Sequence, residues 1–538
     1  MRTRATGKAT KPVIEGRPHG FCTFHSLAYS FASLHRDAFP FPLAENFLAT
    51  PDVQNKFLYF AAKTFHVDFD VLRCTVSKWK RGGLSPASAR LHANDDEAIR
   101  QASAYSAYAC KCKEAGVLDF DSLLMEMESI LRENKFLFGE WQYRYLMVDE
   151  ANDLDEVQIR LCQLLSKTHG NIMLVGDPNQ NVYQFRGSVT DALTDFTKYW
   201  PTGKYLYLGE NFRSSPEIVS FLKATAPIKN ELQERMRSNQ PSGPTPRYCA
   251  YSNNISEAEG VVTELLKKEG TCAVLARCNK QLRPLQDVLA EKDIRYYLLG
   301  NSGFYAQTEV RAVMAYVQCV LYPSDVALLR AIRAPFGPSK YLRKKELCDT
   351  LQKMQKGDPN KPSLWTLIEA HKVLNTPITQ FVNTLHSLSA LRNLPAKDAV
   401  DRVISQIQAI EHYDEDGTDN SPADNIRELP IIAARFGSLK EFLAHVQKVD
   451  AVHRRKKGVA LATIHAAKGS EWDHVYVIGA QEGLIPHKNC ESVADEEKVM
   501  FVANSRAARS LNLSWWGTPS RFIQPYLPKK AEGHKGDR

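Results

Sequence analysis

Short apolar segments that end in polar residues occur in two groups along the chain, and they constrain its fold more than any other feature. The first group is LMVDE (146–150), NIMLVGD (171–177) and KYLYLGENF (204–212). The second is TCAVLARCN (271–279), GVALATIHAAKG (458–469), HVYVIGA (474–480) and SLNLSWW (510–516). Because helical patterns follow these segments, each group is typical of a parallel β-sheet covered by helices. The sequence therefore predicts two α/β domains.

Two helix-rich stretches, residues 36–115 and 331–454, interrupt these α/β segments. They contain longer polar segments and few β-branched runs, so we expect one helical insertion in each α/β domain. The resulting boundaries are 1–35 and 116–227 for the first α/β domain, 228–330 and 455–525 for the second, and 526–538 for a disordered tail.

Composition limits the class of protein further. Of 538 residues, 43% are hydrophobic, which is enough for several separate cores. The 69 Lys and Arg against 61 Asp and Glu give a formal net charge of +8, which allows nucleic acid as a partner without showing it. The eleven cysteines lack paired C-x-x-C spacing, and no segment approaches the roughly 18 apolar residues of a membrane span. We expect a cytoplasmic protein with reduced thiols and no membrane partner.

Polar residues follow the first two apolar strands at positions where nucleotide hydrolases bind magnesium and phosphate. Asp149 and Glu150 end the first strand, and Gln180 follows the second. Mg²⁺ needs hard oxygen ligands, and the attacking water needs a carboxylate that orients it. The N-terminus of a helix also favours acidic residues, so the acidic pair alone leaves both interpretations open.

Aromatic and basic residues come directly after Gln180, in the segment NVYQFRGS. The rings of Tyr183 and Phe185 could stack on unpaired bases, at about 1–3 kcal/mol per base. By themselves, the two rings could equally be ordinary core residues. The neighbouring motif decides which interpretation is favoured.

Together these segments resemble motifs of the UvrD/Rep/PcrA-type superfamily-one DNA helicases. VDEAND (148–153) resembles their second motif and GDPNQNVYQFRGS (176–188) their third. Further segments resemble family motifs in order, namely CTFHSLAYSF (22–31), LDFDSLL (118–124), LGENFRSSPEIV (208–219), TIHAAKGSEWDHVYVIGAQEGLIPH (463–487) and DEEKVMFVANSRAAR (495–509). The resemblance covers nearly the whole chain. It implies a P-loop NTPase fold with two RecA-like motor domains and an ATP-dependent 3′-to-5′ helicase that moves on single-stranded DNA, with ATP and Mg²⁺ as cofactors.

The resemblance implies roles for residues at the ATP site. Asp149 would bind Mg²⁺, Glu150 would orient or deprotonate the attacking water, Gln180 would sense the γ-phosphate and Glu471 would meet the ribose. Two arginines, Arg213 and Arg506, would approach the γ-phosphate from opposite sides of a cleft, with Arg506 as the arginine finger. Outside the motif context, a lone arginine more often forms a surface ion pair.

The resemblance also implies a DNA-binding set. Its stacking rings would be Tyr183 and Phe185, and the residues close to the DNA backbone would be Thr23, His25, Arg186 and His465. Binding would be largely independent of base sequence and sensitive to salt. A lone histidine is as often a packed or capping residue, so both interpretations of the two histidines stay open.

The sequence departs from the family pattern in three places. Asn152 stands where the second motif usually has Gln, and Ser505 where the sixth usually has Thr. No G-x-x-x-x-G-K-[ST] loop, which would cradle the β- and γ-phosphates, occurs in the sequence. We therefore expect the chain alone to be impaired as an ATPase, and the first domain to be incomplete, with exposed strand edges and apolar faces. The open explanations are a start assigned too late, a separate chain that supplies the loop, or a remnant that acts as a DNA-binding scaffold.

Overall fold

A computed structural model describes the chain over the following residues: 13–14, 17–18, 20–182, 191–300, 304–342, 344–357, 362–371, 376–413, 422–453 and 458–528. Three of the expected DNA-binding residues, Tyr183, Phe185 and Arg186, lie outside the described residues. The chain forms two compact units. Unit 1 comprises Met1–Phe212, Val219–Asn239 and Pro486–Ser505, and unit 2 comprises Arg213–Ile218, Gln240–Ile485 and Arg506–Arg538.

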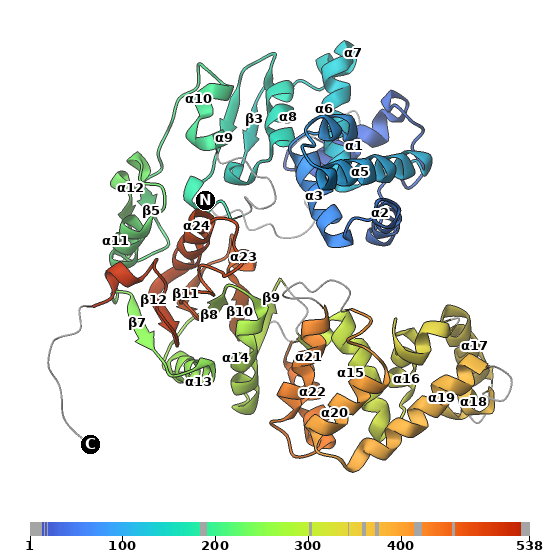
Figure 1. Cartoon of the computed structure of the whole chain (residues 1–538). Coiled ribbons are helices and arrows are strands. Elements are labelled where there is room, and N and C mark those ends of the chain that lie inside the picture. The colour runs from blue at the N-terminus through green and yellow to red at the C-terminus, as the bar shows by residue number, and fades with distance from the viewer. Residues whose placement is uncertain are drawn as a thin grey trace, which may run out of the picture. The chain divides into compact units, whose positions relative to one another are not determined.

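A six-stranded parallel sheet forms the centre of unit 2, with the strand order β7-β12-β11-β8-β10-β9 (Figure 1). The strands are β7 (Arg247–Ala250), β8 (Cys272–Ala276), β9 (Tyr296–Leu299), β10 (Val459–Thr463), β11 (Trp472–Val477) and β12 (Ala507–Trp515). Helices α13 (Asn254–Leu265) and α14 (Asn279–Glu291) follow β7 and β8 and make the crossovers that parallel strands require. All five residues of β8 are buried, as expected for a parallel strand covered on both faces. The expected parallel α/β sheet is confirmed here.

A group of helices in unit 2 packs around α15, whose residues are mostly buried. Figure 1 shows this group beyond α14, away from the sheet. Its members are α15 (Thr308–Leu321), α16 (Asp325–Arg333), α17 (Lys344–Gly357), α18 (Leu364–His371), α19 (Thr376–Ser389), α20 (Ala396–Gln406), α21 (Pro422–Ala433) and α22 (Leu439–His453). Within the described ranges, no helix combines the length and apolar character needed to cross a membrane.

Unit 1 contains a shorter parallel sheet, β3 (Leu146–Val148) and β4 (Ile172–Leu174), joined by helix α8 (Glu156–Ser166). A second parallel pair is β5 (Glu210–Asn211) with β6 (Arg237–Ser238). Helices α1 (Phe24–Leu34) and α6 (Phe120–Glu133) share a core with α8. The other elements are β1 (Val13–Ile14), β2 (Arg17–Pro18), α2 (Pro51–Phe65), α3 (Phe69–Arg81), α4 (Pro86–Leu91), α5 (Asp96–Glu114), α7 (Lys135–Glu140), α9 (Asp191–Thr194), α10 (Phe196–Tyr199), α11 (Pro216–Thr225), which crosses into unit 2, α12 (Glu231–Arg235) and α24 (Val493–Asn504).

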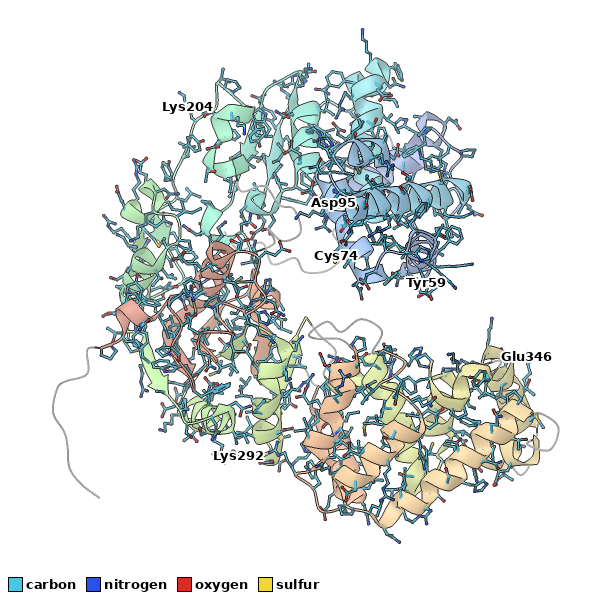
Figure 2. All side chains as sticks on the ribbon, in the orientation of Figure 1. Tyr59, Cys74, Asp95, Lys204, Lys292 and Glu346 are labelled. Carbon is cyan, nitrogen blue, oxygen red and sulfur yellow. The ribbon has the colours of Figure 1, made fainter. Side chains whose placement is uncertain are left out.

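Helices α2 to α5 form a small helical group with its own core, and each begins at a capping side chain. Asp95, for example, accepts a hydrogen bond from the amide of Ala98 and starts α5, where Figure 2 labels it. Tyr59 of α2 is 61% exposed and Cys74 of α3 is also exposed; Figure 2 labels both in this group. The domain boundaries expected for the two insertions stay a prediction.

A buried ion pair attaches this helical group to α6. Lys80 Nζ of α3 lies 2.5 Å from Asp119 Oδ2, and the Tyr108 hydroxyl of α5 donates to the same oxygen at 2.5 Å. Burial alone would raise the pKa of Asp119, yet this pKa lies below its ordinary value because Lys80, Tyr108 and the amide of Ser122 stabilise the carboxylate. One carboxylate therefore holds three helices together.

The prediction of a strand over residues 204–212 is wrong for most of that segment. Only Glu210 and Asn211 pair with a neighbouring strand, β6. Residues 204–209 have no ladder partner among the described residues, and Leu206 and Leu208 are 88% and 84% exposed. A continuous apolar run forms a strand only where a second strand satisfies its backbone groups, so the sequence pattern was insufficient here.

Candidate functional site

Two of the expected site segments meet at the carboxyl edge of β3 and β4. These strands are parallel, with Val148 opposite Leu174, so the residues that follow them lie at the same edge. The amide of Ala151 donates to the carbonyl of Val175 at 2.9 Å and joins the two segments directly. Asp149 and Glu150, which come just before Ala151, are both exposed at this edge.

Glu150 has an unusual backbone conformation. Its φ and ψ are 53° and 39°, in the left-handed region, and it begins the 3₁₀ turn Ala151–Asp153. Its amide donates to the Asp149 carboxylate at 2.9 Å. A residue with a β-carbon costs about 1–2 kcal/mol in this conformation, and such strain is concentrated at functional sites. The turn therefore fixes the direction in which the Glu150 side chain leaves the strand.

Asn152 links the two segments through its side-chain amide. The side chain is buried; its Oδ1 accepts from the amide of Asp177 at 3.2 Å, and its Nδ2 donates to the carbonyl of Gln180 at 3.4 Å. Gln180 in turn donates through Nε2 to Asp177 Oδ2 at 2.9 Å. A β-carbon at position 176 would lie 2.6 Å from Asn152 Oδ1, so the glycine there is needed for this close approach.

Asn152 was not among the predicted site residues, and its side chain is one methylene shorter than the glutamine usual in the second motif. The structure shows that the asparagine amide reaches the second strand-end segment. An amide side chain directly after a strand end is the signal that could have identified Asn152. Its hydrogen-bond partners, Asp177 and Gln180, lie 25 and 28 positions away in the sequence. The line Asp149, Glu150, Asn152, Asp177 and Gln180 is continuous in space.

The oxygen atoms at this edge suit a hard cation that keeps much of its own water. Mg²⁺ is usually bound through one or two carboxylates together with phosphate oxygens and water. Asp149 offers an exposed carboxylate of this kind at the strand end. Among the described residues no group of three or more His, Cys, Asp or Glu side chains could hold a metal ion. The edge therefore fits a magnesium ion that arrives with a phosphate ligand.

The first DNA-binding candidates lie at the start of α1. The Thr23 hydroxyl accepts from the amide of Ser26 at 3.2 Å and caps the helix, a structural task that the sequence did not separate from DNA contact. The ring of His25 lies 5.4 Å from the ring of Phe120, edge to face. Burial lowers the pKa of His25, Asp121 opposes this shift and Arg81 adds to it. His25 is therefore neutral at pH 7 and could contact DNA only as a hydrogen-bonding group.

In unit 2, the two candidate arginines meet the same loop, Ser470–Glu471. Arg213 Nε lies 2.9 Å from Glu471 Oε2, and Arg506 Nη1 donates to the carbonyl of Ser470 at 3.3 Å. The loop precedes β11 as Arg506 precedes β12, and these parallel strands pair with Trp472 opposite Ala507. Glu471 and Arg506 therefore lie at the amino-terminal edge of the sheet.

Burial distinguishes the two arginines. Arg506 is only 2% exposed, whereas the side chain of Arg213 is 32% exposed. His465 lies apart from both, in the short helix α23 (Ile464–Ala467) that follows the carboxyl end of β10. The structure thus brings Arg213, Arg506 and Glu471 together and places His465 at the other end of the strands. The roles expected for these residues stay predictions.

Two family models match the sequence along nearly its whole length. The UvrD/REP helicase N-terminal domain matches residues 1–201, and the UvrD-like helicase C-terminal domain matches residues 206–338 and 338–518. The chain belongs to the UvrD/Rep helicase family. The resemblance found in the motifs is confirmed.

Curated relatives in the UvrD/Rep family agree with this assignment. A Bacillus subtilis (strain 168) protein, provisionally named ATP-dependent DNA helicase YjcD, is 27% identical over 464 residues, covering 80% of this chain and 60% of the relative. The ATP-dependent DNA helicase PcrA of Staphylococcus aureus (strain Mu50) is 25% identical over 574 residues, with 96% and 77% covered. PcrA of Staphylococcus epidermidis (strain ATCC 35984) is 24% identical over 573 residues. The chain spans about three fifths of the length of YjcD.

A buried carboxyl beside this UvrD/Rep site predicts a pH-dependent stability. Burial raises the pKa of Asp155, the N-cap of α8, to about 6, although the amide of Gln158 donates to it at 2.8 Å. The folded state then binds a proton more tightly than the unfolded state, so stability falls as the pH rises from about 4 to about 6.

Asp155→Asn keeps a capping side chain and removes the buried charge. We expect the variant to be more stable than the wild type by about 2 kcal/mol at pH 8 and equal to it near pH 4. Amide hydrogen-exchange protection of α8, measured at both pH values, checks this. The control is Asp95→Asn at the exposed start of α5, which should show no such difference. A gain of the same size at pH 4 and pH 8 would contradict the prediction.

Proposed function

We propose that the chain is the body of an ATP-dependent DNA helicase of the UvrD type, which unwinds duplex DNA while moving 3′ to 5′ on single-stranded DNA. The observation that carries the proposal is the carboxyl edge of β3 and β4. There an exposed carboxylate pair, one member of it in a strained turn, is joined to Gln180 through the buried amide of Asn152. The two parallel sheets would be the centres of RecA-like domains.

The chemistry proposed for this edge follows from its residues. Asp149 would hold the Mg²⁺ that comes with ATP, and that ion would neutralise phosphate charge. Glu150 would accept a hydrogen bond from the attacking water, and the left-handed turn keeps its carboxylate in one direction. Because Gln180 is bonded to Asp177 and reached by Asn152, a change at the γ-phosphate would be passed to the segment that continues to Tyr183 and Phe185.

The residues proposed for unit 2 complete the set. Arg506 and Arg213 would neutralise charge that develops on the γ-phosphate, and Glu471 would contact the ribose. Glu471 pairs with Arg213, so a contact of Glu471 with the ribose requires that this half-buried ion pair open. Exposed pairs contribute only about 0–1 kcal/mol, and because this pair is about one third exposed we expect opening it to cost little more than that.

The proposal is tested by measuring ATP hydrolysis and strand displacement by the 538-residue chain with single-stranded and 3′-tailed DNA. DNA-stimulated hydrolysis with displacement of 3′-tailed but not 5′-tailed duplexes is the expected result for a complete site. The sequence leads us to expect a low rate from the chain alone, because it contains no G-x-x-x-x-G-K-[ST] loop. Unwinding only of 5′-tailed duplexes would contradict the proposed direction.

One observation favours a second function, a DNA-binding scaffold without hydrolysis. The side chains of Met147 and Met173, opposite each other in the β3–β4 register, are 69% and 50% exposed, whereas parallel sheets are usually covered on both faces. A scaffold would bind single-stranded DNA with the same affinity whether ATP is present or absent. A motor would show an affinity that changes with the nucleotide. Fluorescence anisotropy of a labelled oligonucleotide, with and without a non-hydrolysable ATP analogue, separates the two.

A further inference from the structure

A cavity of about 930 Å³ lies in unit 1, along α8 toward its carboxyl end. Helix α8 starts at Glu156, shortly after the carboxyl end of β3, and its 11 residues span about 16 Å. The cavity is lined from Arg160 onward and by the turn that leads to the amino end of β4, together with α6 and the end of α10. It is therefore a separate place from the proposed hydrolytic edge.

Positive charge dominates the cavity wall. Arg132, Arg160 and Lys167 line it, against a single lining carboxylate, Glu128. Glu128 is 7% exposed and is shared by the two arginines, with Arg160 Nε at 3.3 Å. Lys167 lies 6.0 Å from the ring of Phe138 and forms no ion pair with a carboxylate of the described residues. Arg160 also lies 3.5 Å from Glu156, so the three cations face two carboxylates and the remaining positive charge is that of Lys167, which favours an anion.

The backbone of a glycine packs closely against the guanidinium of Arg160. Gly83, in the turn before α4, has φ of 73°, a conformation in which a residue with a β-carbon is strained. A β-carbon there would lie 1.8 Å from Arg160 Nη2. A larger residue at position 83 would have to displace the end of the Arg160 side chain and adopt a strained φ. The contacts of Arg160 with Glu128 and Glu156 position its side chain at the wall before a ligand binds, which reduces the conformational entropy lost on binding.

Part of the cavity lining is aromatic. Tyr199 and Trp200 line the cavity, with their ring centroids 5.9 Å apart. Phe196 stacks on Trp200 at 5.0 Å and an interplanar angle of 29°, which fixes the indole ring. Ser88 and Ser129 also line the cavity. Guanidinium and hydroxyl groups suit phosphate oxygens, and a fixed ring suits a nucleobase.

We propose that this cavity binds a nucleoside phosphate, with its phosphate at Arg160 and Lys167 and its base at Trp200. The volume lies within the roughly 300–1,000 Å³ typical of small-ligand sites. The ligand could be a free nucleotide or one unit of single-stranded nucleic acid, since both present the same base and phosphate. The proposal does not depend on hydrolysis at the β3–β4 edge.

The test is fluorine NMR of the full chain labelled with 5-fluorotryptophan, in which Trp200→Phe identifies one of seven tryptophan resonances. The probes are ADP and a ten-nucleotide oligothymidylate. We expect a saturable shift of the Trp200 resonance. A shift with ADP alone assigns the site to free nucleotide, and a shift with the oligonucleotide assigns it to a nucleic-acid strand.

Two lysine variants make the test specific to the cavity. Lys167→Ala should lower the affinity for the probe about tenfold, because the substitution removes one charge-assisted hydrogen bond. Lys204→Ala is the matched control, since Lys204 is exposed and does not line the cavity; Figure 2 labels it at the surface after α10. The proposal is overturned by no shift with either probe, by equal responses of the two variants, or by an equal shift with a hexaglutamate peptide. Each of these outcomes is independent of the ATPase and strand-displacement results.

Discussion

Replacing Lys80 with methionine is expected to lower the free energy of unfolding of the α3–α5–α6 junction by about 3–5 kcal/mol. The substitution leaves Asp119 buried without its cation, and an unpaired buried charge costs more than the lost contact itself. Because the chain has two units, global unfolding is not a two-state measurement. Amide hydrogen exchange of α3, α5 and α6 is therefore the suitable readout, and it should accelerate by more than a hundredfold.

The Lys80 prediction has a matched control on the same helix and a rescue. Arg73 pairs with Asp70 at 2.6 Å on the exposed side of α3, so Arg73→Met should cost no more than about 1 kcal/mol. Adding Asp119→Asn to Lys80→Met removes the unpaired charge, keeps a capping side chain and should restore most of the protection.

Because the folded pKa of Asp119 lies below its ordinary value, the stabilisation in the wild type should be present at neutral pH and lost as the pH falls below about 4. Equal effects of the two single variants would contradict this account.

A second large effect is expected from Glu150→Gln, which should reduce whatever rate of DNA-stimulated ATP hydrolysis the chain supports by about a hundredfold or more. Loss of a positioned general base typically costs 10²–10⁴ in rate, roughly, because glutamine cannot accept the proton. The amide is nearly isosteric with the carboxylate, so affinity for single-stranded DNA should stay within about twofold. Phosphate release and oligonucleotide anisotropy, measured on the same preparation, check both halves of the prediction.

The control for Glu150→Gln is Glu156→Gln in the first turn of α8. It makes the same chemical change six positions later, where the carboxylate lies 3.5 Å from Arg160. Its rate should be close to that of the wild type. A Glu150→Gln variant that retained its hydrolysis rate would remove Glu150 from the proposed role. It would leave the family assignment intact, because that rests on the matched models.

The parallel sheet of unit 2 was predictable because fully buried strands need uninterrupted apolar residues, as Cys272–Ala276 shows. The same pattern misled at 204–209, since pairing depends on a partner strand that composition does not reveal. The hydrogen bond between Asn152 and Asp177 and the ion pair between Lys80 and Asp119 join residues 25 and 39 positions apart. Neither contact could be predicted from a local sequence pattern. The left-handed turn at Glu150 was also unpredictable, because glutamate rarely adopts it.

The segments of the two units alternate along the chain, and this has a practical consequence for dissecting the protein. The polypeptide passes from one unit to the other at five junctions: 212/213, 218/219, 239/240, 485/486 and 505/506. A protease cut at any one of them leaves the units covalently joined. A fragment of residues 240–485 would also lack β12, the strand between β7 and β11, so its sheet would lose β7 as well. Neither unit can be produced intact as one continuous stretch of the gene.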